Sequence, residues 1–184
     1  IMVFLFIFAD SFITILYSDK YFDSILPFRI YLFMLPVRFV YYGSAFIALG
    51  KTKAILYRSL IELIITAVLA YFLTKTIGYV GAAVATVSMY YIWAIPYNIR
   101  FLGKQFNCKS TYIINFRKIG FIFIISLIAG IIALPVLFIF KESILAISIG
   151  FILFITAYYF FAKKYVIEFN EIISQLLNKV KKHP

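Results

Sequence analysis

The clearest structural signal in this chain is residues 119–162, IGFIFIISLIAGIIALPVLFIFKESILAISIGFILFITAYYFFA. Two apolar runs of about 20 residues are separated there by the short turn Lys141-Glu142-Ser143. A helix of about 20 apolar residues is long enough to cross the hydrocarbon core of a bilayer. The stretch therefore predicts a hairpin of two transmembrane helices, 119–140 and 144–162.

The rest of the chain has the same character. Of its 184 residues 65% are apolar, and only 18 are basic and 7 acidic, whereas a soluble domain is roughly 45–50% apolar and about a quarter charged. This composition excludes a soluble enzyme and a disordered chain, and the single cysteine, Cys108, excludes a disulfide scaffold. The apolar runs are continuous rather than alternating, which favours helices over barrel strands. We predict an all-α integral membrane protein.

About six transmembrane helices are predicted in one lobe, residues 1–162, and the first of them looks truncated at its start. The tail, 163–184, changes character, because its apolar residues recur every three or four positions and lysines gather at its end. We expect an amphipathic helix on the inner membrane surface, with a frayed tail as the alternative. The predicted spans are 1–17, 27–49, 54–73, 80–101, 119–140 and 144–162.

The net charge of +11 reports topology rather than nucleic-acid binding, because the cations lie between apolar runs and form no continuous basic face. The opposite set of loops holds three cations, Lys20, Lys75 and Lys141. By the positive-inside rule the more basic set and the C-terminus are cytoplasmic. That set holds 13 cations: Lys51, Lys53, Arg58, Arg100, Lys104, Lys109, Arg117, Lys118, Lys163, Lys164, Lys179, Lys181 and Lys182.

Ionisable residues inside the spans are the candidate functional residues, because a charge at a helix centre costs about 2.5–3.5 kcal/mol on insertion scales. Four candidates stand out: Asp10, Arg29, Arg38 and Glu62. Arg38 lies about 16 Å below the predicted outer edge, and Glu62 lies about 12 Å from the inner edge. We expect the two at similar depths on neighbouring helices.

Each candidate has two interpretations. Arg38 and Glu62 either form an ion pair that locks two helices, or Arg38 faces a cavity and holds an anionic headgroup. Arg58 precedes Glu62 by four residues and offers it a competing partner. Arg29 either extends to the outer interface or serves a cavity. Asp10 either lines the cavity or pairs with Arg29.

Two prolines and a group of aromatic residues suggest where the spans bend and what they contact. Pro36 and Pro96 lie inside predicted spans and should kink them, either along a transport pathway or simply to fit neighbouring helices. The aromatic group either stacks on sugar rings or forms the ordinary interfacial belt, and we favour the belt. Its members are Tyr90, Tyr91, Trp93 and Tyr97.

Residues suited to catalysis are scarce. The sequence has no metal-ligand cluster, nucleophile triad or phosphate-binding loop, and its single histidine, His183, precedes the last residue. We expect His183 to be solvated and Cys108 to be a free, reduced thiol. The chain is therefore predicted not to be an enzyme and to need no cofactor or metal, although coupling to an ion gradient stays open.

Three stretches of the sequence carry a resemblance to a known family. They are FADSFITILYSDKYFDS (8–24), RIYLFMLPVRFVYYGSAFIALGKTK (29–53) and GYVGAAVAT (78–86). Together they resemble the polysaccharide transporters, the bacterial flippases of lipid-linked oligosaccharide. This family belongs to the superfamily that also includes multidrug exporters and lipid II flippases. The resemblance extends over essentially the whole chain and rests on loose patterns of small residues.

The resemblance implies a partner lobe and a cargo. Such flippases have twelve to fourteen helices in two lobes, so this chain resembles the C-terminal lobe and would need an N-terminal one. Its cargo would be a polyprenyl-diphosphate-linked glycan, moved by alternating access in the bacterial inner membrane. Arg38 is then the first choice for a diphosphate contact and Arg29 the second. A multidrug or cation exporter and a non-transport membrane scaffold are the alternatives.

Overall fold

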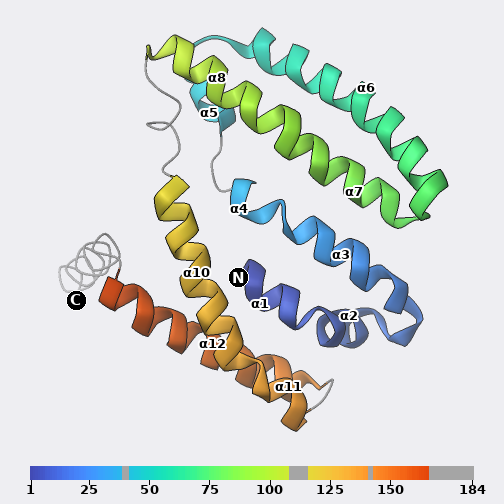
Figure 1. Ribbon diagram of the computed structural model, residues 1–184, viewed down its shortest axis with the longest axis vertical. Helices are drawn as coiled ribbons and strands as arrows, with labels where there is room; N and C mark the ends of the chain where they lie inside the picture. Colours follow the sequence, from blue (N-terminus) through green and yellow to red (C-terminus); the bar gives the residue numbers. More distant parts are fainter. Residues whose placement is uncertain (39–41, 108–115, 141–142, 166–184) are drawn as a thin grey trace, which may run out of the picture.

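A computed structural model describes residues 1–38, 42–107, 116–140 and 143–165, in which every regular element is a helix (Figure 1). The elements, in chain order, are α1 Met2–Ile7, α2 Ala9–Tyr17, the 3-10 helix η1 Asp19–Ser24, α3 Ile25–Leu32, α4 Leu35–Arg38, α5 Tyr42–Ala48, α6 Thr52–Ile77, α7 Val80–Met89, the π-helix η2 Tyr90–Ala94, α8 Ile95–Gln105, α10 Phe116–Ala133, α11 Pro135–Phe140 and α12 Ile144–Tyr165.

Four helical stretches within the described ranges are long and apolar enough to cross a membrane. These are Thr52–Ile77, Val80–Gln105, Ile119–Phe140 and Ile144–Lys163. They correspond to the last four predicted spans, and the predicted all-helical class is confirmed for the described residues. The six-span count and the insertion itself stay predictions. The predicted tail helix lies outside the described residues from position 166 onward.

The first two predicted spans are interrupted. Residues 1–17 form two short helices, α1 and α2, that meet at Phe8. In place of the span 27–49, two helical pieces, Asp19–Leu32 and Leu35–Ala48, meet at an angle of 41°. Pro36 follows this break, and its ring removes the amide donor that the carbonyl of Leu32 would need to continue the helix. The kink predicted at Pro36 therefore coincides with an observed bend.

The second kink is predicted at Pro96, where the structure has a change of helix type rather than a break between two helices. Pro96 lies in the first turn of α8, directly after the π-helical segment η2. A π segment shifts the hydrogen-bond register, and this allows a proline to be accommodated without ending the helix. The span Val80–Gln105 consequently continues through Pro96.

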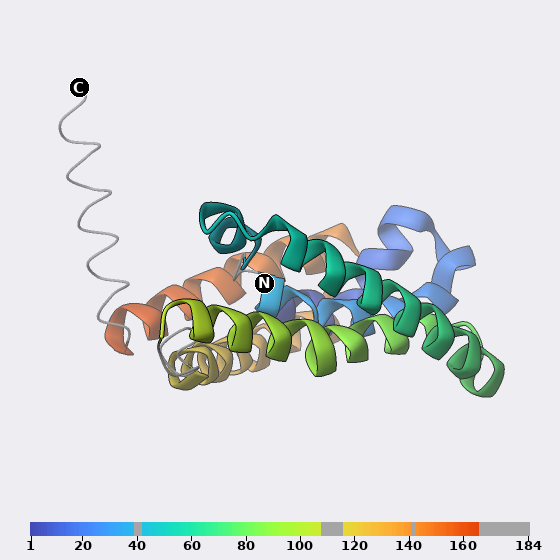
Figure 2. The ribbon, with the colours of Figure 1, turned by 90° about the horizontal axis from the view of Figure 1, so that it is seen from above.

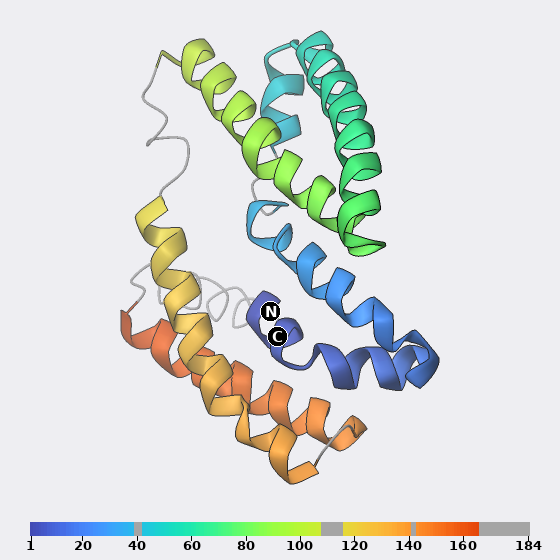
Figure 3. The same ribbon diagram turned by 45° about the vertical axis from the view of Figure 1, so that its right-hand side comes forward.

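The α6–α7 hairpin is the closest helix pair in one half of the molecule (Figures 1 and 3). Gly78, at φ +72°, ends α6 in the left-handed region that favours glycine. Three residues later Gly81 lies directly against the backbone of Leu73 and Thr74, where a β-carbon would collide. Small residues at such contacts let helix backbones approach closely.

The other half is built around α1, α10 and α12 (Figure 1). The rings of Phe4 and Phe8 stack at 4.5 Å and pack with Phe154 of α12. Gly150 of α12 lies against the Phe8 ring, and Gly130 of α10 lies against the side chains of α1. The break at Phe8 therefore positions an aromatic ring in the seam between α1 and α12.

Helix α3 connects the two halves. It packs against α7 on one side and against α1 and α2 on the other (Figure 2). The hydroxyl of Tyr91, in η2, donates a 2.6 Å hydrogen bond to the carbonyl of Phe33. Phe33 follows α3 at the bend, where a carbonyl has lost its helical partner. The π-helical segment of one span thus supplies a hydrogen-bond donor to a backbone carbonyl at the break in another span.

Candidate functional site

Arg29 and Asp10 form an ion pair between α3 and α2. Arg29 Nη2 lies 2.8 Å from Asp10 Oδ2, and Arg29 Nε donates to the carbonyl of Phe6 at 3.2 Å. The guanidinium also lies 5.6 Å from the centre of the Phe6 ring. Both charged side chains keep some solvent access, with exposed fractions of 31% and 41%. Of the two interpretations of Asp10, pairing with Arg29 is the one observed.

Arg38 ends the short helix α4, beside the bend of the second predicted span. Its side chain is exposed and makes no ion pair with any residue that the structure describes. Of the two interpretations of Arg38, the ion pair with Glu62 is not observed. The reason is local, because Glu62 has a closer cation one helical turn away on its own helix.

Arg58 is that cation, and it also binds a neighbouring helix. Its Nη2 lies 3.5 Å from Glu62 Oε2, and its Nη1 donates to Asn98 Oδ1 at 3.0 Å. Asn98 is 1% exposed, and the charged side chains of Arg58 and Glu62 are 19% and 22% exposed. The alternative i, i+4 pair is therefore the observed one, extended by an amide on α8.

The four candidate residues do not gather at one site. Asp10 pairs with Arg29, and Glu62 belongs to a cluster with Arg58 and Asn98. Arg38 has no ion-pair partner among the described residues. Sequence reasoning overlooked Asn98. A polar amide inside an apolar span needs a hydrogen-bond partner, so the position of Asn98 in the span 80–101 could have indicated a polar contact with another helix.

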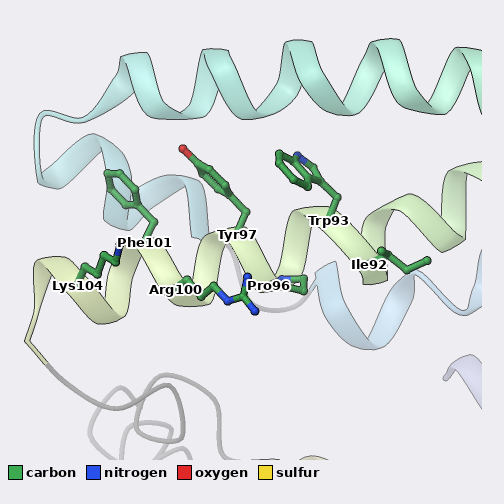
Figure 4. A pocket seen from close by; sticks show the side chains of 7 residues that line it. All are labelled: Ile92, Trp93, Pro96, Tyr97, Arg100, Phe101 and Lys104. Atoms are coloured by element: carbon green, nitrogen blue, oxygen red, sulfur yellow. The ribbon is translucent and has the colours of Figure 1, made fainter.

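A groove of about 290 Å³ runs along η2 and α8 (Figure 4). One wall is a ladder of aromatic rings on the side that faces α6: Trp93 and Tyr97 are 6.0 Å apart, and Tyr97 and Phe101 are 6.1 Å apart. The residues along the other side are Ile92, Pro96, Arg100 and Lys104. The groove therefore has an apolar end and a cationic end.

A second hollow, of about 560 Å³, lies on the far side of the same ladder, at the turn between α5 and α6. Tyr97 and Phe101 line both hollows. The hydroxyl of Tyr97 is 3.5 Å from the carbonyl of Ala54, and Phe101 stacks on Phe46 at 4.8 Å. These rings fill the space between helices, which is a packing role that the belt and sugar interpretations did not include.

No group of three metal-ligating side chains occurs within the part of the chain that the structure describes. Cys108 and His183 lie outside that part. Comparison with protein-family models, with curated proteins and with solved structures finds no match to this chain.

Proposed function

We propose that this chain is part of a transporter that moves lipid-linked oligosaccharide across the bacterial cytoplasmic membrane. It acts by alternating access together with a second helical lobe, and its C-terminus lies in the cytoplasm. It performs no covalent chemistry. Four long apolar helices, a bent span and the resemblance to polysaccharide transporters support this proposal.

The exposure of Arg38 is the observation that supports the proposal most directly. Of the four candidate residues, three are neutralised by a neighbouring charge, whereas Arg38 is exposed without an ion-pair partner among the described residues. A guanidinium stays charged in any protein environment and binds phosphate oxygens in a bidentate manner. At the bend of a span, such a group is suited to hold the diphosphate of a lipid-linked glycan.

Arg29 is now the weaker candidate for the diphosphate. Its guanidinium is already bound by the Asp10 carboxylate and the Phe6 carbonyl. A phosphate would have to displace both acceptors. The same pairing disfavours a drug-cation exporter, because Asp10 and Glu62 are each bound to an arginine and are not available to a cationic drug.

The test is export of the glycan by cells that carry Arg38→Ala in the full-length transporter. We expect export to be lost while the protein remains in the membrane at a normal level, because an exposed arginine with no ion pair among the described residues stabilises little. Arg38→Lys should keep partial export, since the charge remains and the bidentate geometry is lost. Lys75→Ala, at the end of α6, is the matched control for the loss of one cation and should export normally.

The double variant Arg38→Met with Glu62→Leu separates transport from helix locking. Because Glu62 pairs with Arg58, removing it should not restore export. Recovery of export in the double variant would show that Arg38 acts by neutralising Glu62 and would overturn the proposal. Normal export by Arg38→Ala alone would do the same.

A further inference from the structure

The groove along η2 and α8 has the shape of a lipid site. Its cations are Arg100 and Lys104, one helical turn apart, and Ile92 forms its apolar end. The Arg100 guanidinium extends toward Pro96, and the Lys104 side chain lies near Phe101 (Figure 4). Ile92 lies about 18 Å deeper than Lys104 along the helix axis, and one leaflet contributes about 15 Å of hydrocarbon. The groove therefore extends from an interface to about the middle of the membrane.

Among the described residues, the two cations of the groove have no acidic partner. No aspartate or glutamate lines it, and neither Arg100 nor Lys104 makes an ion pair with a described residue. Both side chains are exposed, and Ile92 is 71% exposed. By the predicted topology, this end of α8 lies at the cytoplasmic face. The leaflet there carries anionic lipids, which attract lysine and arginine near the surface.

We propose that this groove binds one anionic phospholipid of the inner leaflet. The headgroup phosphate lies between Arg100 and Lys104, and an acyl chain runs along Pro96 and Ile92 beside the aromatic ladder. A guanidinium and an ammonium one turn apart offer two charge-assisted hydrogen bonds to phosphate oxygens. The site concerns the membrane around the protein and does not depend on which cargo the protein moves.

Trp93 makes the proposal directly measurable, because it is the only tryptophan of the chain and lines the groove. The chain is reconstituted in nanodiscs that contain phosphatidylcholine, with a small fraction of phosphatidylglycerol that has brominated acyl chains. Bromine quenches tryptophan fluorescence at contact. We expect stronger quenching by brominated phosphatidylglycerol than by brominated phosphatidylcholine at the same mole fraction.

Charge-removing variants test whether the preference for phosphatidylglycerol depends on Arg100 and Lys104. Each cation near the surface should raise the affinity of the groove for phosphatidylglycerol over phosphatidylcholine about fivefold. The double variant Arg100→Gln with Lys104→Gln should therefore reduce this lipid preference about 30-fold. The double variant Lys53→Gln with Lys163→Gln removes the same charge from the same predicted face without touching the groove and should keep the preference. Exchanging the two cations, Arg100→Lys with Lys104→Arg, should also keep it.

Three outcomes would overturn the proposal. The first is equal quenching of Trp93 by the two brominated lipids. The second is loss of the preference on addition of inorganic phosphate, which would identify a site for soluble anions. The third is an equal loss of preference in the control variant, which would assign the effect to net charge.

Discussion

Arg58 Nη1 donates a 3.0 Å hydrogen bond to Asn98 Oδ1, which joins α6 to α8 at positions 40 residues apart in the sequence. Asn98 is buried, and the same guanidinium lies 3.5 Å from Glu62. The cluster thus connects the two long helices of one half of the molecule. Polar contacts of this kind hold helices together where lipid provides no hydrophobic driving force.

Replacing Asn98 should show how much this contact stabilises the helix pair. Asn98→Leu removes the acceptor of Arg58 Nη1 at a partly buried position, and we expect a loss of about 0.5–1.5 kcal/mol in the free energy of unfolding. Asn98→Asp keeps an acceptor oxygen and should retain stability. Denaturant titration of helical circular dichroism in detergent measures both variants, with Gln105→Leu on the exposed face as control. A stable Asn98→Leu variant would contradict a structural role for the bond.

Gly81 should tolerate no side chain, because a β-carbon there meets the backbone of α6. Gly81→Ala overpacks the α6–α7 contact, and we expect a loss of about 1–3 kcal/mol. Gly120 in α10 is the matched control, since a β-carbon there meets nothing within 4 Å. In an open helical position alanine gains about 0.5–1 kcal/mol over glycine. Opposite signs for the two substitutions, measured by the same titration, are expected, and equal effects would refute the close approach.

The Asp10–Arg29 pair should behave as a coupled unit. Either Asp10→Leu or Arg29→Met leaves one charge without its partner, so each single variant should lose stability. The double variant removes both charges and should recover part of the loss, with a coupling energy of about 0.5–3 kcal/mol. Asp23→Leu, in the exposed segment η1, is the control for the loss of a carboxylate. Additive effects in the thermal melts of the four proteins would show that the pair is not coupled.

The long apolar helices could be predicted from the sequence because their signal is local. Runs such as Ile144–Lys163 need no tertiary information, and Pro36 indicates its own bend. The break at Phe8 has no such signal, since neither proline nor glycine lies nearby. It depends on the seam with α12, where Gly150 admits the Phe8 ring.

The site was harder to predict, because charge alone does not specify a partner. Depth along the membrane placed Arg38 and Glu62 at one level, but depth says nothing about the direction in which a helix turns its side chains. The i, i+4 pair Arg58–Glu62 was visible in the sequence, whereas its third member, Asn98, became evident only when α8 lay beside α6. Arg100 and Lys104 appeared as topology signals, and their groove requires the three-dimensional arrangement.

The orientation of the chain decides on which side of the membrane the groove opens. From the distribution of 13 cations against three, Cys108 should face the cytoplasm together with the C-terminal end of α8. A membrane-impermeant maleimide added to intact cells should therefore leave Cys108 unlabelled. In a Cys108→Ser background, a cysteine introduced by Lys20→Cys should be labelled, because position 20 lies in the opposite set of loops. Permeabilised cells, in which both cysteines should react, control for accessibility. Labelling of Cys108 in sealed cells would reverse the orientation, and the groove would then face the outer leaflet.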